Sequence, residues 1–215
     1  MSQPLHIIIF GAGGRIGKLL TQQALDDGYY ITGFVQDRQS LAGISHERLH
    51  IYEGDATQRA DVNTALPGHD VVISVLGHSR HTPVEMQSDA MRVITHAMQE
   101  HKIKRIVSLT GVGVFNAMDS PTILDRFFVS VLMFLQPKRI QDGIKHVQAL
   151  KDGDRDWVVL RTPKHRSARA TSNYQIQPTI KGVSFTVHRR NITEELLRQA
   201  TLPEIIDRYP VISDR

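Results

Sequence analysis

The stretch that decides the fold is HIIIFGAGGRIGKLL, residues 6–20. A short apolar run, His6–Phe10, is followed at once by glycines and then by apolar residues at helical spacing. The glycines have the spacing G-x-x-G-x-x-G and are Gly11, Gly14 and Gly17; Gly13 lies outside this spacing and is interpreted as added flexibility. Without Cβ atoms, backbone N–H groups can approach a pyrophosphate, and the start of a helix adds free donors and partial positive charge. The stretch therefore predicts a strand, a dinucleotide-binding turn and a helix over Arg15–Asp26.

Apolar runs rich in β-formers alternate with helical stretches along the next part of the chain. The predicted strands are Tyr30–Val35, Leu49–Tyr52, Val71–Leu76, Ile106–Leu109 and Trp157–Leu160. The predicted helices are Asp61–Leu66, Pro83–His101, Thr122–Leu135 and Arg139–Lys151. Strands separated by helices pair in parallel through right-handed crossovers. The fold class expected is α/β, a doubly wound parallel sheet.

The length of 215 residues fits one domain, so residues 1–215 are expected to form a single dinucleotide-binding unit. The tail is less regular, and about 166–215 is expected to form a small substrate cap. It holds β-like pieces at Tyr174–Gln177 and Val183–Val187. Asn191 is expected to cap a helix over Ile192–Ala200, with Glu194 as its capping-box partner.

Composition and charge exclude several classes of protein. There is no cysteine, which excludes disulfide scaffolds, thiol catalysis and thiolate metal sites. The net charge of +4 comes from scattered basic residues, so direct nucleic-acid binding is not expected. His78 and His81 lack a third ligand nearby in sequence, so no metal site is expected. The longest apolar run, Phe127–Leu135, is far below the ~20 residues of a membrane span, and no export signal is evident, so a cytoplasmic protein without membrane contact is expected.

The end of the second strand bears on the choice of dinucleotide. An acidic residue there would bind the ribose 2′-hydroxyl of NAD, but the position falls at Val35. Gln36 and Asp37 follow; Arg38 could meet a 2′-phosphate, and Arg15 is a second candidate. NADP(H) is therefore expected as the preferred cofactor. NAD(H) stays possible, because Asp37 could hold the ribose hydroxyls.

Beyond the glycine loop, a series of motifs resembles a known family. They are GAGGRIG (11–17), GDA (54–56), HDVVISVLG (69–77), IKRIVSLTGVG (103–113) and DWVVLRTP (156–163). The chain is similar to the atypical short-chain dehydrogenases with an NmrA-like NAD(P)-binding Rossmann domain, and most of all to the biliverdin-IXβ reductase/flavin reductase group. The resemblance covers about residues 5–165 and identifies the superfamily better than the substrate.

The resemblance implies roles for particular residues. Those implied to cradle the pyrophosphate are Gly11, Gly14, Arg15, Ile16 and Gly17. Gln36 stands where flavin-reductase-like relatives carry an arginine for the 2′-phosphate, which leaves that role to Arg38. The remaining implied cofactor contacts are Asp55 and Ala56 with adenine, Leu76 and Gly77 with adenosine and ribose, and Thr110, Thr162, Pro163 and Lys164 with the nicotinamide.

The sequence departs from the acid–base chemistry of ordinary short-chain dehydrogenases. That chemistry uses a Tyr-x-x-x-Lys pair, and none of the five tyrosines has lysine four residues on. Hydride transfer to a flavin, quinone or linear tetrapyrrole needs no such pair. Thr110 is the candidate to contact nicotinamide or substrate, with a structural strand-end threonine as the alternative. His146 is the candidate proton donor, with a surface histidine as the alternative.

These observations predict an NAD(P)H-dependent reductase that transfers hydride to a small, planar conjugated acceptor, acting as a monomer or homodimer. A non-catalytic, NmrA-like dinucleotide-sensing regulator is the alternative. A sugar-nucleotide epimerase or dehydratase-like enzyme is a third, weaker one, because it would need a tyrosine base and a larger substrate domain. Arg166 and Arg169 could recognise an anionic substrate. The apolar residues Phe127, Phe128, Met133 and Phe134 could form a lid, an oligomer contact or a packed helix.

Overall fold

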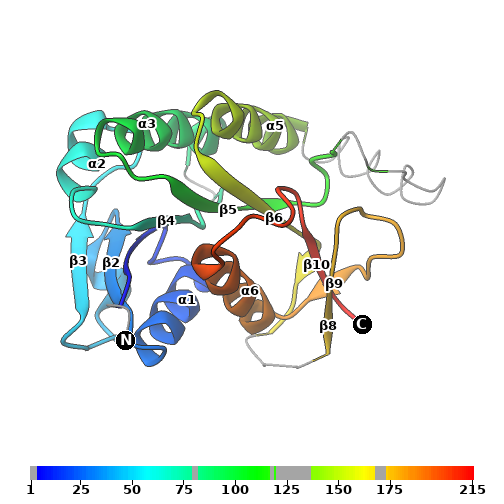
Figure 1. Ribbon diagram of the computed structural model, residues 1–215, viewed down its shortest axis with the longest axis horizontal. Helices are drawn as coiled ribbons and strands as arrows, with labels where there is room; N and C mark the ends of the chain where they lie inside the picture. Colours follow the sequence, from blue (N-terminus) through cyan, green and yellow to red (C-terminus); the bar gives the residue numbers. More distant parts are fainter. Residues whose placement is uncertain (1–3, 79–81, 117–118, 120–136, 168–172) are drawn as a thin grey trace.

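A single eight-stranded sheet organises the molecule (Figure 1). The computed structural model describes residues 4–78, 82–116, 119, 137–167 and 173–215. The strand order is β3-β2-β1-β4-β5-β6-β10-β8, and every neighbouring pair is parallel except β10 with β8. The strands are β1 (His6–Phe10), β2 (Tyr30–Val35), β3 (Leu49–Glu53), β4 (Val71–Ser74), β5 (Arg105–Gly111), β6 (Asp156–Thr162), β8 (Tyr174–Gln177) and β10 (Val211–Asp214). This arrangement confirms the predicted doubly wound α/β fold.

Helices cover both faces of this sheet (Figure 1). On one face, α1 (Arg15–Asp26) packs against α6 (Arg189–Thr201). On the other face, α3 (Met86–Glu100) lies between α2 (Arg59–Ala65) and α5 (Pro137–Asp152). Each face buries its own apolar core, because the central strands are covered on both sides. The side chains of Ile7–Phe10 are therefore fully buried on alternating faces.

The carboxyl ends of the parallel strands meet at one edge of the sheet. The pairings Phe10↔Phe34 and Phe10↔Ser74 bring the ends of β2, β1 and β4 side by side. Gly111↔Thr162 does the same for β5 and β6. The chain order reverses between β1 and β4, and ligands of such sheets bind at that point. The glycine loop, which follows β1, and the loops after β2, β4, β5 and β6 therefore lie around one candidate ligand-binding site.

Much of the segment after residue 166 belongs to the central layers. β8 and β10 extend the sheet beyond β6, and α6 covers it. Apart from these, β7 (Lys164–His165) and β9 (Thr186–Val187) form a separate two-stranded sheet. The predicted capping box was wrong: α6 begins at Arg189 after the N-cap His188, so Asn191 lies buried inside the first turn. The β7–β9 pairing fixes where the chain enters this helix.

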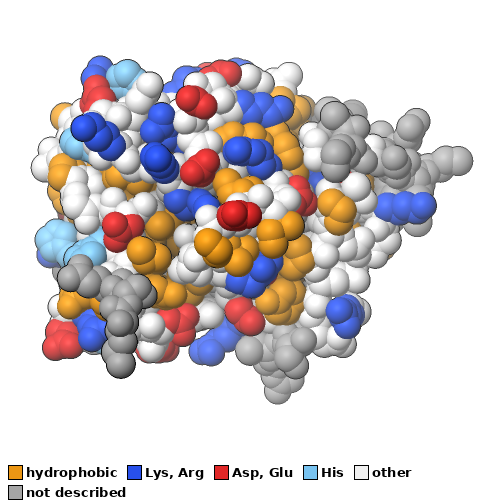
Figure 2. Space-filling model, viewed as in Figure 1, with side chains coloured by type: hydrophobic (Ala, Val, Ile, Leu, Met, Phe, Trp, Pro, Cys, Tyr) orange, Lys and Arg blue, Asp and Glu red, His pale blue; other side chains and the backbone are white. Residues whose placement is uncertain are grey.

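Some predicted features lie outside the described residues, and others concern membrane spans, metal sites or surface charge. The predicted helix Thr122–Leu135, with its four candidate apolar residues, lies outside the described residues, as do His81 and Arg169. Within the described ranges, no helix is long and apolar enough to cross a membrane, and no group of three or more His, Asp or Glu side chains is placed to hold a metal ion. Figure 2 shows basic and acidic side chains interspersed over the visible face.

Candidate dinucleotide-binding site

The glycine loop joins β1 to α1 in a turn that other residues would disrupt. Gly11 has a φ of +83°, a left-handed conformation that favours glycine. A Cβ on Gly17 would lie 2.1 Å from the carbonyl oxygen of Gly11, so this helix residue must be glycine for α1 to pack on the loop. Gly14 is the N-cap of α1, is exposed, and offers no side chain to cap it. The first N–H groups of α1, near Arg15 and Ile16, have no acceptor within the helix and are free for an anion.

Gly13 has a structural role that its sequence position did not reveal. A Cβ there would come within 2.2 Å of the Ser40 hydroxyl oxygen. Ser40 lies in the short 3-10 helix η1 (Arg38–Leu41) after β2, and its hydroxyl is buried without a hydrogen-bond partner among the described residues. Gly13 therefore allows η1 to pack on the glycine loop, and it does more than add flexibility. Sequence reasoning missed Ser40 because no local pattern links it to residue 13.

The end of β2 lies beside the glycine loop, since the Gly11 N–H donates to the carbonyl of Phe34 at 3.2 Å. Gln36 and Arg38 are exposed there. The Arg38 guanidinium donates to the carbonyl of Ile51 at 2.8 Å, which holds the side chain along β3. The carboxylate of Asp37 accepts the N–H of Gln39 and caps η1. The carboxylate therefore already has a local partner.

The loop after β3 carries the two residues implied to contact adenine. The Gly54 N–H donates to the carbonyl of Val35 at 2.8 Å, which fixes this loop against the end of β2. The Asp55 carboxylate accepts the N–H and hydroxyl of Thr57, and Ala56 is buried. The loop thus lies beside the end of β2, and the contacts of Asp55 and Ala56 with adenine stay a prediction.

The loop after β4 closes against the glycine loop. A Cβ on Gly11 would meet the backbone of Val75 and Leu76 at 3.1 Å, so the two loops are in close contact. The amide of Gln87, in the first turn of α3, donates to the carbonyl of Leu76. The next residue, Gly77, is exposed, and a Cβ there would meet no atom within 4 Å. The structure therefore brings Leu76 to the glycine loop, and the contacts of Leu76 and Gly77 with adenosine and ribose stay a prediction.

Thr110 and Thr162 tie the ends of β5 and β6 together. The Thr162 hydroxyl donates to the carbonyl of Thr110 at 3.2 Å and lies 2.8 Å from Nε2 of His165. The Thr110 side chain is buried, and a Cβ on Gly143 of α5 would lie 3.3 Å from its hydroxyl oxygen. Pro163 is half-buried and Lys164 exposed at the start of β7. These residues form the wall of the site beyond β5 and β6.

His146 is a core residue, so the expectation of a surface histidine was wrong. Its side chain is 2% exposed, its Nε2 lies 2.8 Å from the Ser108 hydroxyl oxygen, and its Nδ1 has no hydrogen-bond partner among the described residues. Burial lowers the pKa of His146 to about 4, against a weaker opposing effect of Asp142. The ring is therefore neutral near pH 7 and lacks the acidic proton of an imidazolium, which disfavours the predicted role as proton donor. The helix periodicity of α5 could have placed it inward with Val147 and Leu150.

A second buried group near the site was missed entirely. The Asp142 carboxylate, one turn before His146, accepts the N–H groups of Gln87 and Ser88 at 3.1 Å each and lies 2.9 Å from Nε2 of His78. It caps the N-terminus of α3, where negative charge is stabilising. Through these contacts α5 holds the loop that follows β4. No local signal marks Asp142, because its partners are more than 50 residues away in sequence.

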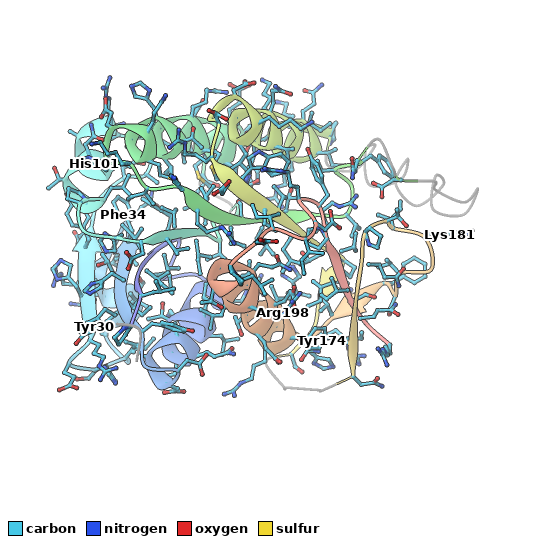
Figure 3. The ribbon with its side chains drawn as sticks, viewed as in Figure 1. Tyr30, Phe34, His101, Tyr174, Lys181 and Arg198 are labelled. Atoms are coloured by element: carbon cyan, nitrogen blue, oxygen red, sulfur yellow. The ribbon has the colours of Figure 1, made fainter. Side chains whose placement is uncertain are left out.

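Tyr174 is poorly suited to act as an acid–base phenol. Tyr174 lies on β8, next to Arg198 of α6 (Figure 3). Burial, followed by the charges of Glu194 and Glu195, raises the pKa of Tyr174 to about 12. This phenol holds its proton more tightly than a free tyrosine, the opposite of what proton exchange near pH 7 needs.

Exposed glycines at the strand ends fit a dinucleotide laid across this edge. Gly14, Gly77 and Gly111 are exposed at the ends of β1, β4 and β5, and a Cβ on either of the last two would meet no protein atom within 4 Å. Open backbone of this kind lets a ligand approach closely. Together with the free N–H groups of α1, these residues define a dinucleotide-binding Rossmann protein.

Comparison with known proteins names the family. The model of the NAD(P)H-binding family matches residues 11–203, and the chain belongs to that family. A short-chain dehydrogenase/reductase from Veillonella parvula in complex with NADP has a TM-score of 0.79 at 19% identity, over 99% of this chain and 95% of that one. ChuY from Escherichia coli O157:H7, described as an anaerobillin reductase, has a TM-score of 0.80 at 16% identity, over 97% of each chain. At these identities the likeness shows a shared fold with oxidoreductase-like proteins.

Proposed function

We propose that the protein is an NAD(P)H-dependent reductase of a planar conjugated acceptor such as a flavin, a quinone or a tetrapyrrole-like compound. Bound NAD(P)H would supply the hydride. The observation that carries the proposal concerns the residues around Thr110. The residue of α5 that lies against Thr110 is Gly143, and the described residues place no tyrosine–lysine pair at this edge of the sheet.

The chain's own contribution would be binding and orientation. A flat ring system fits over open backbone, and Gly77 and Gly111 leave the backbone open on two neighbouring strand ends. Lys145 of α5 is half-exposed and forms an ion pair with Glu85 at the surface. Holding two flat rings face to face accelerates a reaction by proximity, without an acid–base residue.

We further propose that NADP(H) is preferred over NAD(H). Val35 is buried and cannot bind a ribose hydroxyl, while the Arg38 guanidinium has donors beyond the one it gives to Ile51. The neighbour from Veillonella parvula, which has a similar fold, was crystallised in complex with NADP, and this supports the choice. The Glu53 carboxylate accepts the N–H of Arg38 at 3.1 Å, and its negative charge would repel a 2′-phosphate bound there. The preference for NADP(H) over NAD(H) is therefore expected to be modest.

Oxidation of NADPH and NADH by the purified protein, with FMN, riboflavin, simple quinones and biliverdin as acceptors, tests the reductase proposal. Turnover with at least one acceptor is expected. Thr110→Val should lower kcat about tenfold if its hydroxyl orients the reactants. The matched control is Thr64→Val, on the exposed surface of α2. Tight dinucleotide binding without turnover of any acceptor would overturn the proposal and favour the dinucleotide-sensing regulator, which needs no acid–base pair either.

A further inference from the structure

The two-stranded sheet β7–β9 gathers basic residues at the edge of the site. Lys164 and His165 pair with Thr186 and Val187, directly after the end of β6. The Arg166 N–H donates to the carbonyl of Val187 at 2.8 Å, and the Arg189 N–H donates to the carbonyl of Ser167 at 3.1 Å. The start of α6 is thereby fixed next to the chain that leaves β6.

His165 is close enough to the first residues of two helices to feel their charge. Burial, followed by the positive charges of Arg189 at the start of α6 and Arg15 at the start of α1, lowers the pKa of His165. Both guanidinium groups are therefore within electrostatic range of this ring. Each helix start adds further partial positive charge. The edge of the sheet beside β6 is consequently a place of concentrated positive potential.

These cations have no carboxylate partners in the part of the chain that the structure describes. Arg15, Lys164, Arg166 and Arg189 form no ion pair there, whereas arginines elsewhere pair with Asp119, Glu195 and Glu100. The Asp214 carboxylate accepts the N–H of His188 at 3.1 Å and lies 3.9 Å from its ring. Like charges held together without a counter-ion repel one another, and a bound anion relieves that cost.

We propose that Arg166 and Arg189, which the β7–β9 pairing holds on either side of His165 and Val187, form a subsite for an anionic side arm of the acceptor, a phosphate or a carboxylate. This inference rests on the proposed reductase function. Arg15 lies at the start of α1, where the pyrophosphate of the dinucleotide binds. Arg166 and Arg189 belong instead to the segment beyond β6, on the side where the acceptor would lie.

Matched acceptor pairs test the subsite. FMN and riboflavin share one ring system and differ in the phosphate, and biliverdin differs from its dimethyl ester in its carboxylates. Arg166→Gln and Arg189→Gln are each expected to raise KM about tenfold for the charged member of whichever pair the enzyme accepts, because one charge-assisted contact is lost. The KM values for the uncharged member and for NADPH should not change. Arg190→Gln, the next residue of α6 and equal in charge, is the control and should leave all three values unchanged.

The outcomes separate this inference from the function on which it rests. If no acceptor is reduced, the reductase proposal fails, and the subsite is then tested by quenching of flavin fluorescence on binding of FMN and riboflavin. Equal effects on the charged and uncharged members, or no effect on either, would overturn the subsite. A weaker affinity for NADPH in Arg189→Gln would also overturn it, by assigning the residue to the pyrophosphate.

Discussion

The buried His146 makes the stability of the fold depend on pH in a defined direction. With a pKa of about 4 in the folded protein and 6.5 in the unfolded chain, the unfolded chain binds more protons between these values. The stability associated with the neutral ring is therefore present above pH 6.5 and is lost as the pH falls towards 4. Each pKa unit corresponds to about 1.4 kcal/mol, so the loss from pH 7 to pH 4.5 is about 2.5 kcal/mol.

The variant His146→Gln isolates this effect, because glutamine does not titrate and can keep a hydrogen bond to Ser108. Urea unfolding of both proteins at pH 7 and pH 4.5 measures the free energies of unfolding. The stability of the natural protein relative to the variant should fall by about 2.5 kcal/mol between the two pH values. His96→Gln, an exposed histidine on α3, is the control and should show little change. If the difference in the free energy of unfolding between His146→Gln and the natural protein stays constant with pH, the assignment of a neutral, buried ring is refuted.

Two further variants test the cofactor assignment and the core. Arg38→Ala should weaken NADPH binding about tenfold and leave NADH binding unchanged, as measured by calorimetry, because only NADPH carries the 2′-phosphate; an unchanged ratio of the two dissociation constants would remove Arg38 from that role. Asp119→Ala should lower the free energy of unfolding by about 3 kcal/mol, because it leaves the fully buried guanidinium of Arg161 without its carboxylate; a loss below about 1 kcal/mol in urea unfolding would contradict this.

The parts of the fold with strong local signals could be predicted from the sequence. The bounds of β1, β2 and α1 match the prediction, because glycines mark the end of β1 and the end of α1 and the helical spacing begins directly after the glycine loop. β10 was missed, because four residues, Val211–Asp214, carry no readable period and gain their order by pairing with β6 and β8. The start of α6 was misplaced for a similar reason, since long-range pairing of β9 outweighs the capping preference of Asn191.

The same contrast between local signals and long-range contacts applies to the residues of the candidate site. The glycines and strand ends could be placed because they follow directly from the order of the elements. The burial of His146, the contact of Gly13 with Ser40 and the capping of α3 by Asp142 depend on how distant segments pack. Such contacts have no signature in a single sequence.

The central claim is that a dinucleotide binds with its pyrophosphate at the start of α1, and Gly14→Asp tests it most directly. Aspartate is a good N-cap, and Gly14 is exposed with a φ of −72°, while its Cβ would lie 3.3 Å from the Gly11 carbonyl oxygen, so the variant should fold with thermal stability close to that of the natural protein. Its carboxylate would face the pyrophosphate and repel it. NADPH binding by Gly14→Asp, measured by calorimetry, should weaken at least about a hundredfold, while the control Gly43→Asp should bind as the natural protein does. A folded Gly14→Asp protein that binds NADPH with undiminished affinity would contradict the central claim.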